Sequence, residues 1–315
     1  MRYITYYRVK LMKPNDGYFP SFMTVHQVAE YLQLNEKKIY ALVGEQRLPA
    51  TKVTGKWMFP RELIDQWLLE SSHGGMLLDR LLIGGPDDPL FLFFAELAGQ
   101  QNSNHALVGY VNRDTRSALD LLASGRLDVA LLHWGPEEES SVRHPALLEL
   151  HRKRTDWILV GGIKRELGLV SRKAGSIETE LAISNWADPD LRWVRRPVTD
   201  GVWRFFQDAA IQAGFDSVQL SISLEVSTER DAAAAVAGGV ADIAPASRAT
   251  ANQFGLAFKP LGWEQIDMVM HRDIWFRRLF QMLLEIMTNK ASVQFAERLG
   301  GYDFAPCGQL LWGDR

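Results

Sequence analysis

One segment of the sequence, called the repeated strip below, occurs twice in similar but not identical form. Arg116–Leu132 reads RSALDLLASGRLDVALL, and it returns as RDAAAAVAGGVADIAPA at Arg230–Ala246. Each copy opens with Arg, runs through an amphipathic segment to Ala-x-Gly, and closes on Asp-[Val/Ile]-Ala. Solenoid units recur every ~20–50 residues, so copies this far apart indicate two similar lobes and not a tandem array. The chain is therefore expected to hold a two-lobed domain.

Length and composition limit the number of domains and the kinds of site that the chain can have. A chain of 315 residues suits roughly two or three domains. The single cysteine, Cys307, excludes an internal disulfide, and no Cys and His have metal-ligand spacing, so we expect neither a metal site nor a cofactor. The longest apolar run begins at Pro89 and is too short for a bilayer, and no signal peptide is indicated, which predicts a cytoplasmic protein. With a net charge of -3, any nucleic-acid contact needs a local basic face.

The N-terminal part has the pattern of a helix-turn-helix. Residues 1–20 contain turn formers and are expected to be an arm or a short strand. Thr24 and Asn35 are expected N-caps of two short amphipathic helices joined by a tight turn. A hairpin signal follows at Thr54-Gly55, and Pro60 opens a third helix. The predicted order is helix, turn, helix, wing, helix.

The segment from Met23 to Leu69 resembles the excisionase-type winged helix-turn-helix, which is related to the MerR class. The match lies in TVHQVAEYLQLNEKKIYALV and RLPATKVTGKWMFPRELIDQWL. The resemblance implies that the second helix enters the major groove of duplex DNA while the wing contacts phosphate. By this resemblance, the residues that contact the major groove are Asn35, Lys37, Lys38 and Tyr40. Those that contact the DNA phosphate backbone are Arg47, Lys52, Thr54 and Lys56. The module has no net charge, so the prediction rests on the clustering of its basic residues between Lys37 and Lys56. The alternative is a module for docking or dimerisation.

From residue 73 onward, short strands alternate with helices, which is typical of an α/β domain. Together with IGGPDDPL, GLVSR, GLAFKPLGWEQIDMV and LGGYD, the repeated strips resemble the periplasmic-binding-protein-like (type II) domain. Such domains follow winged helix-turn-helix modules in bacterial regulators, and others are joined to molybdopterin biosynthesis enzymes. The expected fold is thus an N-terminal winged helix-turn-helix, residues 21–72, and a two-lobed α/β sensor domain, residues 73–315.

The repeated strips place helix N-termini at a cleft between the lobes, where backbone N–H groups favour an anion. Candidate ligand contacts at this cleft are Asp87, Asp88, Arg116, Ser117, His133, Arg195, Arg196, Asp200, Gly201, Trp203 and Thr228. Most of them have a structural alternative. The Asp, Ser and Thr residues are also ordinary helix caps, His133 suits a structural role, and the two arginines suit a solvated surface pair.

The loop RRPVTDGVWR departs from the glycine-rich donor loop of these relatives. Asp200 would repel a dianion, whereas Trp203 or Trp134 would stack on a flat ring. The resemblance therefore puts a molybdate- or tungstate-like anion first, narrowly ahead of an organic ring compound.

No Gly-x-Ser-x-Gly, P-loop or HExxH motif is present, and we do not expect an enzyme. The predicted function is a ligand-responsive DNA-binding transcription regulator that acts as a homodimer. The alternative is a docking protein that does not bind DNA, but binds a molybdenum-cofactor intermediate or a protein partner.

Overall fold

The computed structural model describes residues 19–45, 48–53, 55–72, 79–101, 106–151, 156–172 and 186–313. The chain divides into two compact units, Met1–Leu78 and Asp79–Arg315. Among the described residues, no helix has the length and apolar character needed to cross a membrane. The expected arm lies outside the described residues except for Phe19 and Pro20.

The first unit is a helix-turn-helix with a three-stranded sheet of order β1-β3-β2. Thr24 caps α1 in a reciprocal capping box with Gln27, and the Asn35 side chain accepts the Lys38 N–H at the start of α2, as the sequence predicts. Its core contains Val28, Ile39 and Phe59. The bounds are β1 Phe22–Met23, α1 Val25–Tyr31, α2 Glu36–Gly44, β2 Thr51–Val53, β3 Lys56–Pro60 and α3 Arg61–Ser72.

The second unit is built on one ten-stranded sheet of order β5-β4-β6-β11-β7-β10-β8-β9, with β12 and β13 added to β7. Its strands are β4 Asp79–Gly85, β5 Ala106–Asn112, β6 Val129–His133, β7 Trp157–Ser171, β8 Trp193–Arg195, β9 Ile222–Glu225, β10 Ile243–Ser247, β11 Ala257–His271, β12 Tyr302–Asp303 and β13 Leu310–Trp312. Its helices are α4 Pro89–Gln101, α5 Thr115–Ala123, α6 Ser140–Glu149, α8 Gly201–Gln212, α9 Glu229–Ala237, α10 Arg248–Gln253, α11 Arg272–Trp275, α12 Arg278–Thr288 and α13 Lys290–Leu299.

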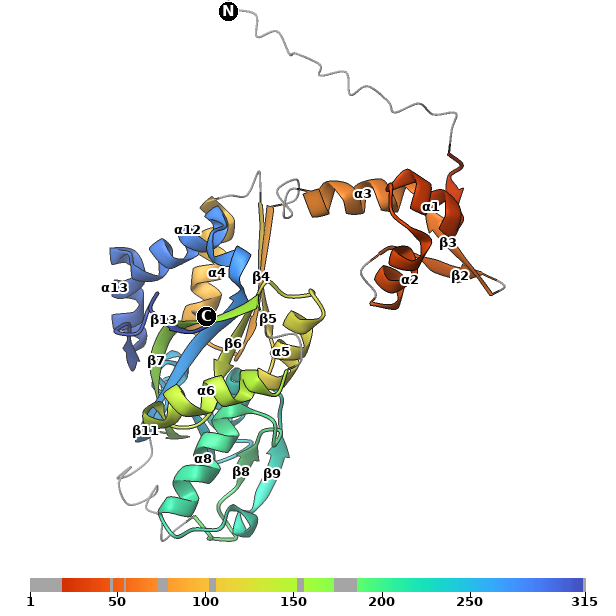
Figure 1. Cartoon of the computed structure of the whole chain (residues 1–315). Helices are drawn as coiled ribbons and strands as arrows, with labels where there is room; N and C mark the ends of the chain where they lie inside the picture. Colours follow the sequence, from red (N-terminus) through yellow and green to blue (C-terminus); the bar gives the residue numbers. More distant parts are fainter. Residues whose placement is uncertain are drawn as a thin grey trace, which may run out of the picture. The chain divides into compact units, whose positions relative to one another are not determined.

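The long antiparallel strands β7 and β11 join two lobes (Figure 1). The start of β7 and the end of β11 pair with each other beside β6, β4 and β5, in the first lobe. The end of β7 and the start of β11 lie in the second lobe, where β10, β8 and β9 continue the sheet from β7. Both connections between the lobes are therefore strands of the shared sheet. The two-lobed α/β fold expected from the sequence is confirmed.

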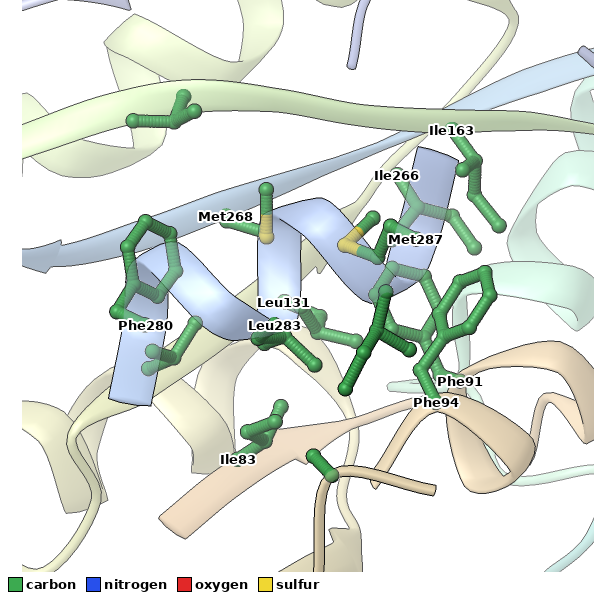
Figure 2. Packing of buried hydrophobic residues seen from close by; sticks show 14 of the residues in the cluster. Ile83, Phe91, Phe94, Leu131, Ile163, Ile266, Met268, Phe280, Leu283 and Met287 are labelled. Atoms are coloured by element: carbon green, nitrogen blue, oxygen red, sulfur yellow. The ribbon is translucent and has the colours of Figure 1, made fainter. Parts of the chain in front are cut away.

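Each lobe has its own hydrophobic core. In the first lobe, Phe280, Leu283 and Met287 of α12 pack with Met268 of β11 and with the aromatic rings of α4 (Figure 2). In the second lobe, Trp186, Trp193 and Phe206 form a buried aromatic cluster. The two lobes are therefore packed around different sets of side chains.

The repeated strips fold alike. In each, a helix (α5 or α9) leads through a turn to an aspartate that precedes a strand (β6 or β10). Asp128 Oδ2 accepts the backbone N–H of Leu82 at 2.8 Å, and Asp242 Oδ2 accepts that of Arg192 at 3.0 Å. The backbone N–H of each aspartate donates back to the carbonyl of the same residue, Leu82 or Arg192. The repeat thus encodes one α-turn-β unit in each lobe.

Candidate functional site

A buried guanidinium lies where the paired strands β7 and β11 pass from one lobe to the other. Arg165, in the middle of β7, pairs in register with Glu264 of β11, and both side chains are fully buried. Arg165 Nε donates to Glu264 Oε1 at 2.6 Å, and its Nη1 donates to Asp88 Oδ2 at 3.1 Å. Nη1 also lies 3.5 Å from Glu229 Oε2. One arginine therefore meets carboxylates from the first lobe, the second lobe and the connecting strands.

The carboxylates around Arg165 are held by other contacts as well. Asp88 Oδ1 accepts the backbone N–H groups of Leu90 and Phe91 at the start of α4, while the Tyr302 hydroxyl donates to its Oδ2. Burial raises the pKa of Asp88, and Arg165 partly offsets this. Burial also acts to raise the pKa of Glu264, but Arg165 and His133 outweigh it and lower that pKa to about 2.

A second buried arginine belongs to the second lobe. Arg196 Nη2 donates to Asp200 Oδ2 at 2.5 Å, and its Nη1 lies 3.7 Å from Glu229 Oε2. Asp200 Oδ1 accepts the Trp203 N–H, so the same carboxylate both caps α8 and pairs with Arg196. Glu229 Oε1 accepts from the Ser247 and Thr250 hydroxyls and the Ser247 N–H. Its other oxygen therefore remains directed at the two guanidiniums.

His133 and Gly201 bring the lobes into direct contact. His133 ends β6 with its ring fully buried, and its Nδ1 lies 3.8 Å from Glu264 Oε2. A Cβ on Gly201, the first residue of α8, would lie 2.2 Å from His133 Nδ1 and 2.7 Å from its carbonyl oxygen. Only glycine permits this approach.

Beside this contact, Asp87 of the first lobe pairs with Arg230 of the second. Arg230 Nη2 and Nε donate to Asp87 Oδ1 at 2.6 and 2.9 Å, and its backbone N–H donates to Oδ2 at 3.1 Å. Asp87 is buried, whereas the Arg230 side chain is 48% exposed. This pair lies at the edge of the cluster.

Several buried polar atoms of the cluster have no hydrogen-bond partner among the described residues. They are Arg165 Nη2, Arg196 Nε and Nη1, both ring nitrogens of His133, and Glu264 Oε2. The cluster has more carboxylates than guanidiniums, because Asp87, Asp88, Asp200, Glu229 and Glu264 surround Arg165, Arg196 and Arg230. A dianion would meet net negative charge here.

A cavity of about 440 Å³ opens between the lobes beside this cluster. The first lobe contributes α5, α6 and Trp134, and the second contributes the loop before α8 through Val198 and Thr199. The wall is mostly apolar, with Arg116 in the first turn of α5. The lining residues are Thr115, Arg116, Leu119, Asp120, Trp134, Leu147, Leu150, His151, Val198 and Thr199.

A model of the PBP superfamily domain matches residues 95–288, more than half of the chain. The chain belongs to the PBP superfamily. A helix-turn-helix domain model matches residues 22–72. No curated protein sequence matches the chain.

Solved structures share the fold of this PBP superfamily member. A cysteine-to-serine mutant of OxyR from Corynebacterium glutamicum, bound to H2O2, is 14% identical with a TM-score of 0.52, over 88% of this chain and 89% of that one. A putative phosphate ABC transporter substrate-binding protein from Clostridium perfringens, with bound phosphate, is 9% identical with a TM-score of 0.53, over 70% and 98% of the two chains. At these identities the likeness establishes the fold alone. The relation to molybdate and to the MerR class stays a prediction.

The predicted ligand residues of the PBP superfamily domain divide into two groups. Asp87, Asp88, His133, Arg196, Asp200 and Gly201 gather in the buried cluster, and Arg116 lines the cavity. The others have local roles. Ser117 donates to Asp114, Thr228 accepts the Asp231 N–H, and Arg195 forms an exposed pair with Glu225.

Trp203 corrects one interpretation of the sequence. The sequence offered its ring or that of Trp134 for stacking on a flat ligand, but Trp203 is 2% exposed and packs against Phe206 in the core of the second lobe. A ring in that position cannot reach a ligand, whereas Trp134 lines the cavity.

Sequence reasoning missed Arg165, Glu229, Arg230 and Glu264. For Arg165 and Glu264 the available signal was a charged residue in an apolar strand, as in GGIKRELGLV and GWEQIDMVM. Such a residue is buried only if it is paired.

In the helix-turn-helix domain, the residues predicted to contact DNA are exposed where they are described. Asn35, Lys37, Lys38 and Tyr40 lie on or next to α2, while Lys52 and Lys56 lie on the wing strands. Lys52 Nζ also lies 5.6 Å from the centre of the Trp57 ring. Arg47 and Thr54 lie outside the described residues.

Proposed function

We propose that this protein is a transcription regulator whose affinity for duplex DNA responds to a small molecule bound between the lobes of its PBP superfamily domain. The observation that carries the proposal is the joining of a helix-turn-helix domain, with an exposed basic second helix and wing, to a domain with an interlobe cavity. Binding, and not catalysis, is the role that these features support.

The cavity favours an organic effector. Its volume of about 440 Å³ falls within the range of about 300–1,000 Å³ that is usual for small-molecule sites. Trp134 and Leu119 offer an apolar wall for a ring, and Arg116 offers a cation to an acidic substituent. Asp120 lies one helical turn from Arg116 and disfavours a second negative charge. We infer that the effector is an aromatic monoanion.

The buried cluster supports this preference over a molybdate- or tungstate-like dianion. Asp200 already neutralises Arg196, and the cluster has an excess of carboxylates. Its side chains are also almost fully buried, apart from Arg230 at the edge. An oxyanion would have to displace paired carboxylates in order to reach the guanidiniums.

Calorimetric titration of the full chain with benzoate and indole-3-carboxylate, and with molybdate and tungstate, tests the effector class. We expect saturable binding of an aromatic monocarboxylate that Trp134→Ala and Arg116→Ala each weaken about tenfold or more, as loss of ~1.4 kcal/mol does. Arg126→Ala, an exposed change in the same lobe, is the matched control. Sub-micromolar molybdate binding together with no heat from the carboxylates would contradict the proposed class.

We further propose a homodimer. The basic residues predicted on α2 and the wing offer only about four to six phosphate contacts, and one such module binds DNA weakly at physiological salt. Two modules that read adjacent half-sites gain both affinity and specificity. Sedimentation equilibrium of the full chain tests this, and a monomer at micromolar concentration would contradict it.

A further inference from the structure

The contacts around Arg165 are those of a bound guanidinium ligand. Its Nε and Nη1 meet Glu264 on the connecting strand and Asp88 of the first lobe, and Glu229 of the second lobe lies 3.5 Å away. A guanidinium is a planar fork that carboxylates recognise through paired N–H donors. In a two-lobed domain, a ligand stabilises closure when it contacts both lobes. Arg165 meets that condition from within the chain.

Further contacts join the lobes independently of Arg165, and Arg143 of α6 with Asp208 of α8 is one of them. Asp87 and Arg230 form a three-contact pair across the edge of the cluster. Gly201 lies against His133 with no room for one additional methyl group. The lobes are therefore already in contact at the point where a closing ligand would otherwise bridge them.

We propose that the PBP superfamily domain is held closed without an effector by an internal ionic lock, formed by Arg165 with Asp88, Glu229 and Glu264 and by Asp87 with Arg230. Opening would separate Asp88 and Asp87 from Glu229 and Arg230, which breaks contacts of both parts of the lock. The effector is then not the group that draws the lobes together. A molecule that binds only an open form would have its apparent affinity reduced by the small open fraction.

Distance measurements on the effector-free full chain test the lock. Val142 of the first lobe and Val218 of the second are 70% and 86% exposed, so Val142→Cys and Val218→Cys can carry spin labels in a Cys307→Ser background. We expect a single narrow distance that matches the structure. Arg165→Ala and Arg230→Ala should each broaden the distribution toward longer distances. Arg195→Ala removes an exposed pair within one lobe and should leave the distribution unchanged.

Chemical rescue separates a lock from a general loss of stability. Millimolar methylguanidinium should restore the narrow distance in Arg165→Ala, because it fills the position between the same carboxylates, whereas NaCl at equal ionic strength should not. If Arg165→Ala does not fold, Asp87→Asn and Arg230→Ala carry the test at the edge of the cluster. The lock is overturned if the unmodified chain already shows a broad distribution, or if folded lock variants keep the narrow one.

Discussion

Gly201 is a position between the lobes where no side chain larger than hydrogen fits. The Cβ of an alanine there would lie within 2.7 Å of both the ring and the carbonyl of His133. Backbone cannot turn aside as a flexible side chain can, so Gly201→Ala should destabilise the domain by about 1–3 kcal/mol through overpacking. Thermal unfolding of the full chain measures this.

Gly99→Ala is the matched control for Gly201→Ala. Gly99 also lies in a helix, α4, and its nearest neighbour to an added Cβ is 3.9 Å away. Alanine should be neutral there or stabilise the helix by up to about 1 kcal/mol. Equal melting temperatures for the two variants would contradict the tight contact between Gly201 and His133.

Asp242 predicts a component of acid sensitivity. Hydrogen bonds from the Arg192 side chain, with further donors from its backbone and Arg172, lower the Asp242 pKa to about 2 even though burial opposes this. A lowered folded-state pKa contributes stability above the unfolded value near 4, and this stability is lost as the pH falls from about 4 to about 2. Because the arginine partners of Asp242 are nearly half exposed and solvent screens the pairs, the contribution at neutral pH is about 1 kcal/mol.

Urea unfolding between pH 7 and pH 3 measures the Asp242 contribution. Asp242→Asn should lower stability at pH 7 and flatten the pH dependence, since the substituted side chain no longer titrates. Glu225→Gln removes a half-exposed surface pair and should change stability by less than about 1 kcal/mol. An unchanged pH profile for Asp242→Asn would contradict the assignment.

At the scale of elements, local patterns were enough for the helix-turn-helix and for the repeated α-turn-β unit. Apolar spacing and cap residues predicted α1 and α2, and the repeated strip predicted the two equivalent α-turn-β units. The centre of the candidate site was not predictable in this way. Arg165 and Glu264 are far apart in the chain, and only the register between β7 and β11 pairs them. Trp203 failed for a related reason, because periodicity does not say whether a ring faces the core or a cleft.

The second helix and the wing carry the DNA prediction. Lys38 on α2 and Lys56 on β3 are exposed, and the proposal assigns them to groove and phosphate contacts. Replacing both by alanine should weaken binding to all duplexes and reduce the slope of log affinity against log salt by about 1, because Lys56 is the phosphate contact of the pair. Lys290→Ala, at an exposed position in the other domain, is the charge control. Equal slopes for the double variant and the unmodified chain would remove the assigned face.

At the scale of the whole molecule, a helix-turn-helix domain and a PBP superfamily domain share one chain. The proposed function requires a free-energy coupling between them. Such coupling is reciprocal, so an effector that changes DNA affinity by a given factor must have its own affinity changed by DNA by the same factor.

The most direct test is fluorescence anisotropy of the full chain on a duplex selected from random DNA, with and without a saturating aromatic carboxylate that binds in calorimetry. The proposal predicts that the effector changes duplex affinity about fivefold or more, as couplings of ~1 kcal/mol or above do. Trp134→Ala should move that change to about tenfold higher effector concentration and leave effector-free DNA binding intact. Equal duplex affinity with and without the effector would contradict the proposed coupling. If the chain binds no duplex at all, the alternative of a docking protein that does not bind DNA is favoured.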